Sequence, residues 1–379
     1  MEYAAKLKLL GAAARWDASA PSTVAARDPL PDGSSAIYEA LGVDGHRMRI
    51  LKVLLSNACS YDCLFCPMRA SRSQQRASFR PEELARLTSE LRQAGLIEGL
   101  ELSSGIVGDP DSTMERMIET ARLLRHQHGF RDHLHLKLMP GASEAAMISA
   151  AEVADRLSLN LEVPAPELLS SVCPAKDFTR HLMRPLRQAV AMVAPGRLAG
   201  GVTTQFVVGA ADETDRQLLE LTWQLLAQTG LRRVHFCALE PIEDTPMAGA
   251  EPTPAMREQR LCQAELLLRA YGFEPSEIVF DAAGMLPLEM DPKLASAETR
   301  EELFPIEVNS AERWELLRVP GIGPTVVESL IFAREQTRLK SLRQLTTLGV
   351  RVDRARNFLT LGGRFYPRRP SGQQLSLEM

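Results

Sequence analysis

Short apolar runs alternate with longer amphipathic runs over the first 250 residues of the chain. The short runs predict strands, and the runs with apolar positions at helical spacing predict helices between them. The predicted strands cover residues 49–55, 100–105, 133–139, 157–163, 202–208 and 233–239. One predicted helix begins at Pro81, and three others cover residues 114–126, 143–154 and 212–229. Such alternation predicts an α/β fold with a parallel sheet and crossover helices.

Two of these strands carry polar side chains on one face and apolar side chains on the other. The polar faces consist of His133, His135 and Lys137 on one strand and of Ser158, Asn160 and Glu162 on another. A buried polar face costs free energy unless it finds partners or a ligand. The pattern therefore favours a barrel whose lumen binds a ligand, and a solvated strand face is the alternative.

The composition is that of a water-soluble globular protein with two or three domains. The chain has 379 residues, of which 45% are hydrophobic and 24% charged. It contains no apolar run long enough to span a membrane and no signal peptide, and residues 1–10 predict a surface-packed helix. Residues 11–45 predict a short helix followed by a loop.

Charge is distributed unevenly along the chain. The net charge is −4, but residues 311–379 carry +6 and residues 1–310 carry −10. A basic end on an acidic body predicts that this end has a polyanionic partner.

Three cysteines follow the first predicted strand. Cys59, Cys63 and Cys66 have the spacing C-x3-C-x2-C. Structural zinc requires four ligands, whereas three thiolates on an iron–sulfur cube leave one iron open for a small molecule. Unrelated core thiols, or a zinc site completed from elsewhere, are the alternatives. The remaining cysteines lack paired spacing and are interpreted as buried small apolar residues; they are Cys173, Cys237 and Cys262.

This three-cysteine stretch resembles the signature of the radical S-adenosylmethionine (radical SAM) enzymes, and Phe65 before the last cysteine fits that pattern. The resemblance implies a partial (β/α)6 TIM-like barrel, a 4Fe–4S cluster and S-adenosyl-L-methionine (SAM). It also implies reductive cleavage of SAM to a 5′-deoxyadenosyl radical, and an electron donor such as flavodoxin or ferredoxin. Because thiolate-bound clusters need a reducing compartment, we expect a cytoplasmic protein.

The same resemblance suggests which residues bind SAM. Asn160-Leu161-Glu162 resembles the arrangement with which some members hold the ribose hydroxyls. Ser103-Ser104-Gly105 stands where many members have Gly-Gly-Glu for the amino group, so backbone carbonyls or hydroxyls would act in place of the missing glutamate. The predicted cofactor-binding residues are Phe65, Ser103, Ser104, Gly105, Lys137, Asn160, Glu162 and Gln205.

A second motif lies near the C-terminus, where two predicted helices flank Val319-Pro320-Gly321-Ile322-Gly323. The glycines expose backbone N–H groups at the start of the second helix, which is a site for phosphate. The stretch resembles the helix–hairpin–helix motif, and residues 342–359 resemble a degenerate second copy. The predicted nucleic-acid-binding residues are Pro320, Gly321, Ile322, Gly323 and Thr325, with further phosphate contacts from Arg318, Arg334, Arg351 and Arg354. A packing or protein-interaction module is the alternative.

Together the two motifs resemble those of a bacterial group of radical SAM proteins thought to modify or repair DNA. The expected domains are an extension over residues 1–45, a barrel over 46–250, a linking extension over 251–305, an all-α helix–hairpin–helix domain over 306–366 and a disordered tail over 367–379. The end of the tail, Gln374 to Met379, resembles peptides that bind the replication sliding clamp.

The first functional hypothesis is therefore a radical SAM enzyme that acts on a nucleic acid, with DNA favoured. One alternative is a radical SAM enzyme that acts on RNA, a peptide or a small metabolite. Another is an iron–sulfur protein that binds DNA or senses redox state without turnover.

Overall fold

The computed structural model describes residues 3–16, 36–41 and 46–367 and divides them into two compact units after Cys262. The possible clamp peptide and the tail from residue 368 lie outside the described residues, as does most of the predicted loop before residue 46. Among the residues that the structure describes, no helix combines the length and apolar character needed to cross a bilayer.

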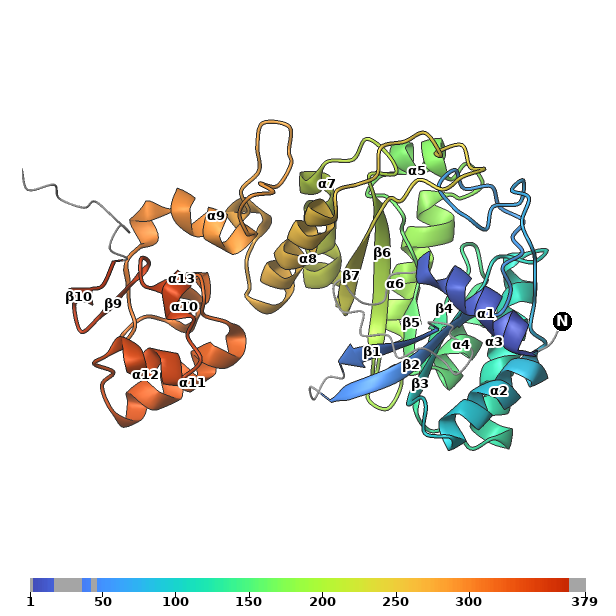
Figure 1. Cartoon of the computed structure of the whole chain (residues 1–379), viewed down its shortest axis with the longest axis horizontal. Helices are drawn as coiled ribbons and strands as arrows, with labels where there is room; N and C mark the ends of the chain where they lie inside the picture. Colours follow the sequence, from blue (N-terminus) through green and yellow to red (C-terminus); the bar gives the residue numbers. More distant parts are fainter. Residues whose placement is uncertain (1–2, 17–35, 42–45, 368–379) are drawn as a thin grey trace, which may run out of the picture. The chain divides into compact units, whose positions relative to one another are not determined.

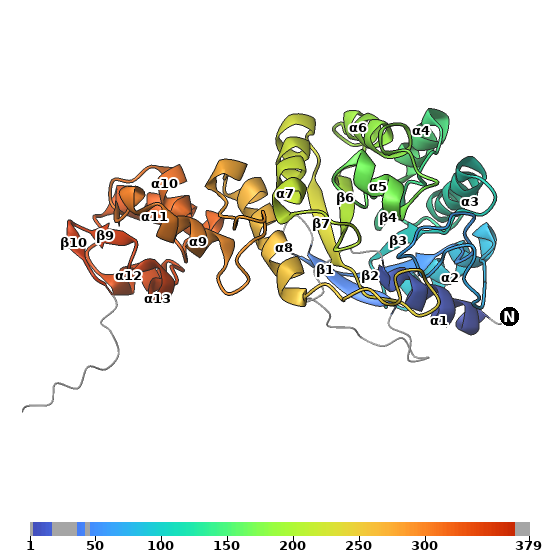
Figure 2. The ribbon, with the colours of Figure 1, turned by 90° about the horizontal axis from the view of Figure 1, so that it is seen from above.

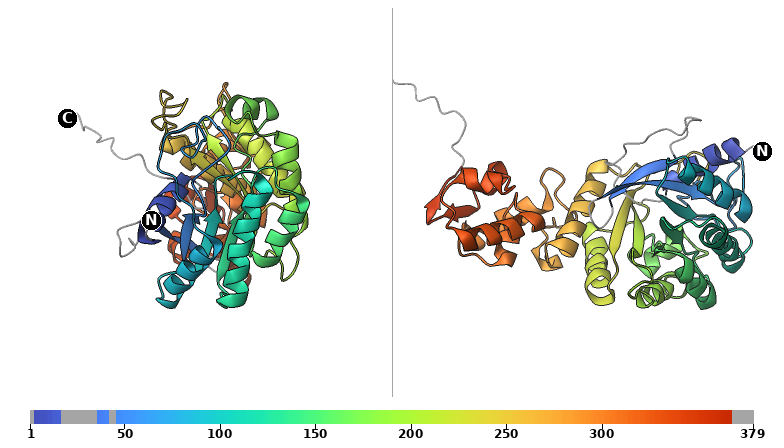
Figure 3. Two further views of the ribbon diagram at one scale, coloured as in Figure 1. Left: turned by 90° about the vertical axis from the view of Figure 1, so that its right-hand side faces the viewer. Right: turned by 90° about the horizontal axis from the view of Figure 1, so that it is seen from below.

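The first unit is built on a seven-stranded sheet whose strands lie side by side in sequence order (Figure 1). The first pair of strands is antiparallel and all later pairs are parallel. The strands are β1 (Ile37–Leu41), β2 (Arg47–Leu54), β3 (Gly99–Ser103), β4 (His133–Lys137), β5 (Arg156–Ser158), β6 (Gly201–Val208) and β7 (Arg233–Ala238). The sheet is open and curls into a partial barrel (Figure 3).

Helices follow the outer side of this curled sheet (Figure 2). They are α2 (Pro81–Gln93), α3 (Pro110–Arg122), α4 (Glu144–Val153), α5 (Pro166–Val172), α6 (Arg184–Ala191) and α7 (Asp215–Gln224), with α1 (Tyr3–Ala13) before the first strand. Three of these helices begin at an N-cap residue. The side chains of Asp109, Ser143 and Thr214 each accept a hydrogen bond from a backbone N–H in the first turn of α3, α4 and α7. Single π-helical turns extend α3 and α7 and precede α6.

The predicted α/β class and the six parallel strands are confirmed. Three local expectations are wrong. Residues 37–41 form the antiparallel edge strand β1 instead of a loop. Helices α5 and α6 occupy a stretch for which the sequence predicted no element. The strand predicted over residues 157–163 ends at Ser158, because the chain bulges at Leu161 and Glu162.

The second unit contains a small sheet as well as helices, so the expectation of an all-α domain is wrong. Its strands are β8 (Ile306–Glu307), β9 (Leu359–Leu361) and β10 (Arg364–Phe365), in the order β10-β9-β8. Its helices are α9 (Pro292–Thr299), α10 (Arg313–Arg318), α11 (Pro324–Gln336), α12 (Leu342–Thr347) and α13 (Val352–Ala355), while α8 (Ala255–Ala270) crosses the division between the units. The predicted domain boundaries at residues 45, 250, 305 and 366 stay predictions.

A tight turn joins α10 to α11, as the sequence predicted. Gly321 has φ +87°, a conformation that favours glycine, and Gly323 stands at the N-cap of α11. The carbonyl of Gly321 accepts the N–H of Arg351 at 3.0 Å, so the turn between α12 and α13 packs on the first turn. The apolar core beneath consists of residues such as Leu316, Leu317, Val327, Leu330, Leu345 and Leu359.

Arg318, at the end of α10, is a structural residue of the second unit. Its guanidinium donates two hydrogen bonds to the carboxylate of Glu277, at 2.7 and 3.0 Å. It also donates to the carbonyl oxygens of Tyr271 and Gly272. Because the side chain is only 9% exposed, the expectation that Arg318 contacts phosphate is wrong.

We predict that Arg318→Ala lowers the free energy of unfolding of the second unit by about 3 kcal/mol, because it leaves a partly buried carboxylate without its main partner. Urea denaturation of the full chain, followed by Trp314 fluorescence, measures the change. Arg313→Ala is the matched control, since Arg313 pairs with Glu328 on the surface and such pairs contribute less than about 1 kcal/mol. Equal losses in the two variants would contradict the structural role of Arg318.

Candidate cofactor site

The three motif cysteines lie on the loop between β2 and α2, at the carboxyl end of β2. Backbone hydrogen bonds tie this loop to the segment after β3: Gly105 donates to Ser56 at 2.8 Å, and Ser60 donates to Ile106 at 2.7 Å. The loop therefore stands where parallel α/β barrels place their sites, at the carboxyl ends of the strands.

One arginine holds the loop from within. The guanidinium of Arg76 donates to the carbonyl oxygens of Asn57, Met68, Arg69 and Arg72, at 2.5 to 3.0 Å. A loop has few backbone partners of its own, and a planar guanidinium with five donors satisfies several carbonyls at once. Arg76 thereby fixes both ends of the segment that carries the thiols.

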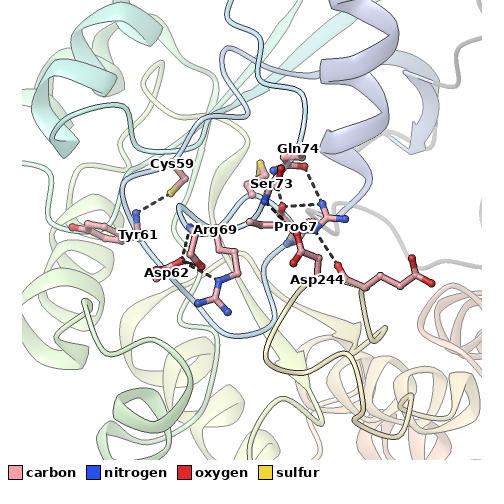
Figure 4. Close-up of polar contacts among 12 residues, drawn as sticks. Cys59, Tyr61, Asp62, Pro67, Arg69, Ser73, Gln74 and Asp244 are labelled. Atoms are coloured by element: carbon pink, nitrogen blue, oxygen red, sulfur yellow. Dashed lines mark hydrogen bonds and ion pairs between the residues drawn. The ribbon is translucent and has the colours of Figure 1, made fainter.

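A carboxylate organises the cysteine loop from the outside (Figure 4). Asp62 accepts hydrogen bonds from the backbone N–H and hydroxyl of Ser71 and from Nε of Arg69, at 2.9 to 3.0 Å. These bonds, above all the backbone bond from Ser71, lower the pKa of Asp62 to about 2. Within the same loop, the N–H of Tyr61 donates to Sγ of Cys59 at 3.4 Å. Asp62, within the motif, is thus joined to Arg69 and Ser71 in the chain that follows it.

The three thiols have different surroundings. Cys63 is buried and Cys59 and Cys66 are half-buried. A hydrogen bond with Cys173 lowers the pKa of Cys63 to about 7, whereas desolvation raises the pKa of Cys66 to about 12. In the described part of the chain, no three side chains of His, Cys, Asp or Glu converge as ligands of a single ion.

A single cavity brings the predicted site residues together. The space open to the centre of a water molecule is about 130 Å³. All three motif cysteines and all eight predicted cofactor-binding residues line it: Cys59, Cys63, Cys66, Phe65, Ser103, Ser104, Gly105, Lys137, Asn160, Glu162 and Gln205. Their grouping agrees with the sequence prediction, and their individual roles stay predictions.

The chain after β5 turns Glu162 into this cavity by a bulge. The N–H groups of Leu161 and Glu162 both donate to the carbonyl of Gln205, at 3.1 Å each, so two residues oppose one. Glu162 has φ +67°, which is unusual for a residue other than glycine and costs free energy. Nδ2 of Asn160 lies 3.5 Å from Oε2 of Glu162. Both side chains therefore face the cavity.

Sequence reasoning missed two residues of the site. Nζ of Lys176 donates to Oε1 of Glu162 at 2.8 Å, and Lys176 lines the cavity. Burial alone would lower the pKa of Lys176, but the nearby Cys63 and Glu162 hold it well above its usual range. Cys173 is fully buried, which agrees with its interpretation as a small apolar core residue, whereas Cys237 is half-buried and lines the cavity. No spacing or periodicity in the sequence connects them to the motif.

Below the cavity, the interior of the partial barrel is polar. Nε2 of His135 lies 2.8 Å from the hydroxyl of Ser158, and the hydroxyl of Tyr38 donates to Glu101 at 2.6 Å. Burial lowers the pKa of His133 to about 4 and also lowers that of His135. The polar row on β4 therefore faces the lumen, and the alternative of a solvated strand face is wrong for His135.

Gly105 lies against the cysteine loop so closely that it has no room for a side chain. A Cβ at this position would collide with the carbonyl of Ala58 and crowd the Cβ of Cys59. We predict that Gly105→Ala costs about 2 kcal/mol of stability through overpacking and displaces the loop. Urea denaturation measures the cost. Gly249→Ala is the control, because nothing lies within 4 Å of its added Cβ. Equal stability of both variants would contradict this close packing.

Comparison with known proteins gives distant structural likenesses only. No protein-family model and no curated protein sequence matches the chain. The hydrogenase maturase HydG from Carboxydothermus hydrogenoformans is 16% identical with a TM-score of 0.47, over 57% of this chain and 50% of that one. Methylornithine synthase (PylB) is 18% identical with a TM-score of 0.46, over 57% and 60%.

A radical SAM methyltransferase from Sphaerobacter thermophilus is 18% identical with a TM-score of 0.45, over 64% of this chain and 74% of that one. This chain spans about half the length of HydG. At such identities and scores the likenesses carry no argument about the reaction, the substrate or the partners of this chain.

Proposed function

We propose that this protein is a radical SAM enzyme that acts on a nucleic acid, with DNA as the favoured substrate. One observation carries the enzymatic part: a single cavity at the carboxyl ends of the strands gathers the C-x3-C-x2-C thiols with Asn160 and Glu162. These residues come from distant parts of the chain, and a chance cysteine spacing would not explain why they converge.

The residues around the loop fit a 4Fe–4S cluster held by Cys59, Cys63 and Cys66. The motif offers three thiolates and leaves one iron open. When bound, such a cluster would supply the electron that cleaves SAM to methionine and a 5′-deoxyadenosyl radical. Arg76 and Gly105 keep the thiols in place, and Phe65 and Leu239 among the cavity walls exclude water.

The polar side chains of the cavity are suited to orient SAM. The carboxylate of Glu162 and the amide of Asn160 lie side by side and can hydrogen bond to two neighbouring hydroxyls, as on a ribose. Lys176 positions Glu162 by an ion pair at 2.8 Å. The hydroxyl of Ser104 donates to the carbonyl of Gly105 at 2.7 Å, which leaves the other carbonyl lone pair for a donor such as an amino group.

The nucleic-acid part of the proposal is supported by the turn between α10 and α11. The first N–H groups of a helix lack intrahelical acceptors, and Thr325 in the first turn of α11 is exposed. Arg351 is also exposed and joins the turn through its backbone bond to Gly321. Two other predicted contacts are engaged inside the unit: Arg334 donates to the carbonyls of Val308 and Ala311, and Arg354 pairs with Asp291. Thr325 and Arg351 are therefore the proposed phosphate contacts.

A second candidate function is cleavage of SAM to act on RNA, a peptide or a small metabolite, with the turn serving for packing. The packing of Arg351 on Gly321 favours this reading of the turn. A third is an iron–sulfur protein without turnover. Turnover of SAM would distinguish the two enzyme hypotheses from the iron–sulfur protein without turnover. Binding of a polyanion would distinguish an enzyme that acts on a nucleic acid from one that acts on a peptide or a small metabolite.

We predict that anaerobic reconstitution of the full chain gives one oxygen-sensitive 4Fe–4S cluster, and that the reduced protein forms 5′-deoxyadenosine from SAM. Cys63→Ala should abolish both, because a cube cannot be held by two thiolates. Iron and sulfide analysis and chromatography of the nucleoside are the measurements. Cys262→Ala, outside the cavity, is the control. SAM cleavage that persists in Cys63→Ala would refute the enzymatic proposal.

We predict that the full chain binds DNA weakly, with an affinity that falls steeply with salt, and that it prefers single strands over intact duplex. The preference follows because a base must leave the stack to enter the cavity. Arg351→Glu should weaken binding and reduce the salt dependence, since it removes a cation that contacts phosphate, and Thr325→Glu should weaken binding by placing a negative charge beside the phosphate. Fluorescence anisotropy with labelled oligonucleotides at several salt concentrations is the measurement.

The control for these variants is Arg86→Glu, which makes the same change of charge as Arg351→Glu on the exposed face of α2. It should leave DNA binding unchanged. Gly321→Val is unsuitable as a test of binding, because a Cβ there would meet the carbonyl of Arg351 and unfold the turn. An intact protein that binds no oligonucleotide at low salt would refute the DNA assignment and favour a peptide or metabolite.

A further inference from the structure

Two arginines face the lumen of the partial barrel at the amino ends of its strands, opposite the cysteine loop. Arg156 is the first residue of β5 and lines a small pocket in the lumen together with His235. Arg233 is the first residue of β7 and lies on the same face of that strand as His235, because side chains alternate along a strand. Strand β6 runs between them and begins with Gly201, which pairs with Arg156 and carries no side chain. The two arginines thus border one polar space.

In the part of the chain that the structure describes, neither arginine forms an ion pair with a carboxylate. Nε of Arg156 donates to the carbonyl of Gly200 at 3.1 Å. Nε of Arg233 is buried and has no hydrogen-bond partner among the described residues. Glu101 lines the same pocket, but it already forms an ion pair with Lys52 at 3.5 Å. A buried charged donor costs free energy until an acceptor satisfies it, so the arrangement favours an anion as the acceptor.

The two arginines also act on the same histidine. His235 is 8% exposed, and burial lowers its pKa well below the usual range, while the positive charges of Arg233 and Arg156 act in the same direction. Burial lowers the pKa of Arg156 as well, and the charge of Arg233 adds to this effect. A neutral imidazole offers one N–H donor and adds no further positive charge. An anion between the two guanidinium groups would therefore remove their mutual repulsion and accept hydrogen bonds from both.

We propose that a compact anion, either a chloride ion or a carboxylate group, binds in the lumen between Arg156 and Arg233. The pocket leaves about 20 Å³ to the centre of a water molecule, against about 130 Å³ in the cofactor cavity, so it admits such a group and not a nucleotide. The anion is either a free ion or the carboxylate of a molecule that enters from the cavity, because Lys137, Asn160 and Gln205 line both spaces. This inference does not depend on the proposed function.

The test measures the thermal unfolding midpoint of the full-length protein in potassium chloride, bromide or formate, against potassium gluconate at equal ionic strength. Gluconate is too large for the pocket. We expect each small anion to raise the midpoint of the wild type in a saturable manner, by about 3 °C at ten times its Kd, since it binds the folded state alone. Arg156→Met and Arg233→Met should each lose this rise, because each removes one of the two charges and keeps a long apolar side chain.

Arg86→Met, on the exposed face of α2, is the control and should keep the rise. Anomalous diffraction from wild-type crystals soaked in bromide should locate the ion between Arg156 and Arg233, and this arm needs no variant to fold. Formate that displaces the bromide would assign the site to a carboxylate, whereas bromide that resists formate would assign it to a free ion. Water alone between the two arginines in those crystals would overturn the inference. A rise that is equal in the wild type and in both Met variants would overturn it as well.

Discussion

The close approach of the cysteine loop to the segment after β3 is the constraint on which the candidate site depends. Gly105 donates to Ser56 and leaves no room for a side chain beside Ala58 and Cys59. Because β2 and β3 are parallel neighbours, this approach aligns the loop with the carboxyl edge of the whole sheet. Arg76 then satisfies the carbonyls that such a loop cannot pair by itself. The thiols therefore stand at a defined height above the lumen, where residues of later strands can reach the same cavity.

The bulge at Glu162 is the second device that shapes the cavity. A regular strand over residues 157–163 would keep every second side chain on one face, as the alternation of leucines predicts. The two N–H groups that share the carbonyl of Gln205 interrupt this period and place Glu162 in a left-handed conformation. The ion pair with Lys176 helps to stabilise that conformation. Backbone strain at a lining residue is typical of binding sites, where orientation outweighs local stability.

The hydrophobic periodicity of the sequence predicted most of the fold but few details of the candidate site. The parallel strands were predictable because buried strands in α/β proteins are apolar runs separated by helical ones. The cysteines and Asn160 were predictable because motif spacing and a polar face persist in a linear sequence. Lys176 and Cys173 were not, since they stand in irregular chain after α5, which the backbone bond between Leu64 and Val172 holds beside the cysteine loop. Strand β1 is short and pairs antiparallel with β2, so it stands outside the repeat of parallel strands from which the other strands were predicted.

In the second unit, the number of arginines in the sequence overestimates the positive charge that is free to bind a phosphate. The excess of basic residues over residues 311–379 predicts a polyanion partner, yet three of the four arginines expected to contact phosphate, Arg318, Arg334 and Arg354, are engaged inside the unit. Arg318 satisfies Glu277 and two carbonyls, and Arg334 satisfies the carbonyls that precede α10. Arginine serves this purpose well because its planar fork pairs with carboxylates and carbonyls in several directions. A charge used in this way contributes to folding and not to counterion release. Electrostatic attraction of a nucleic acid would therefore depend on exposed cations such as Arg351, whose backbone N–H donates to the carbonyl of Gly321 in the glycine turn.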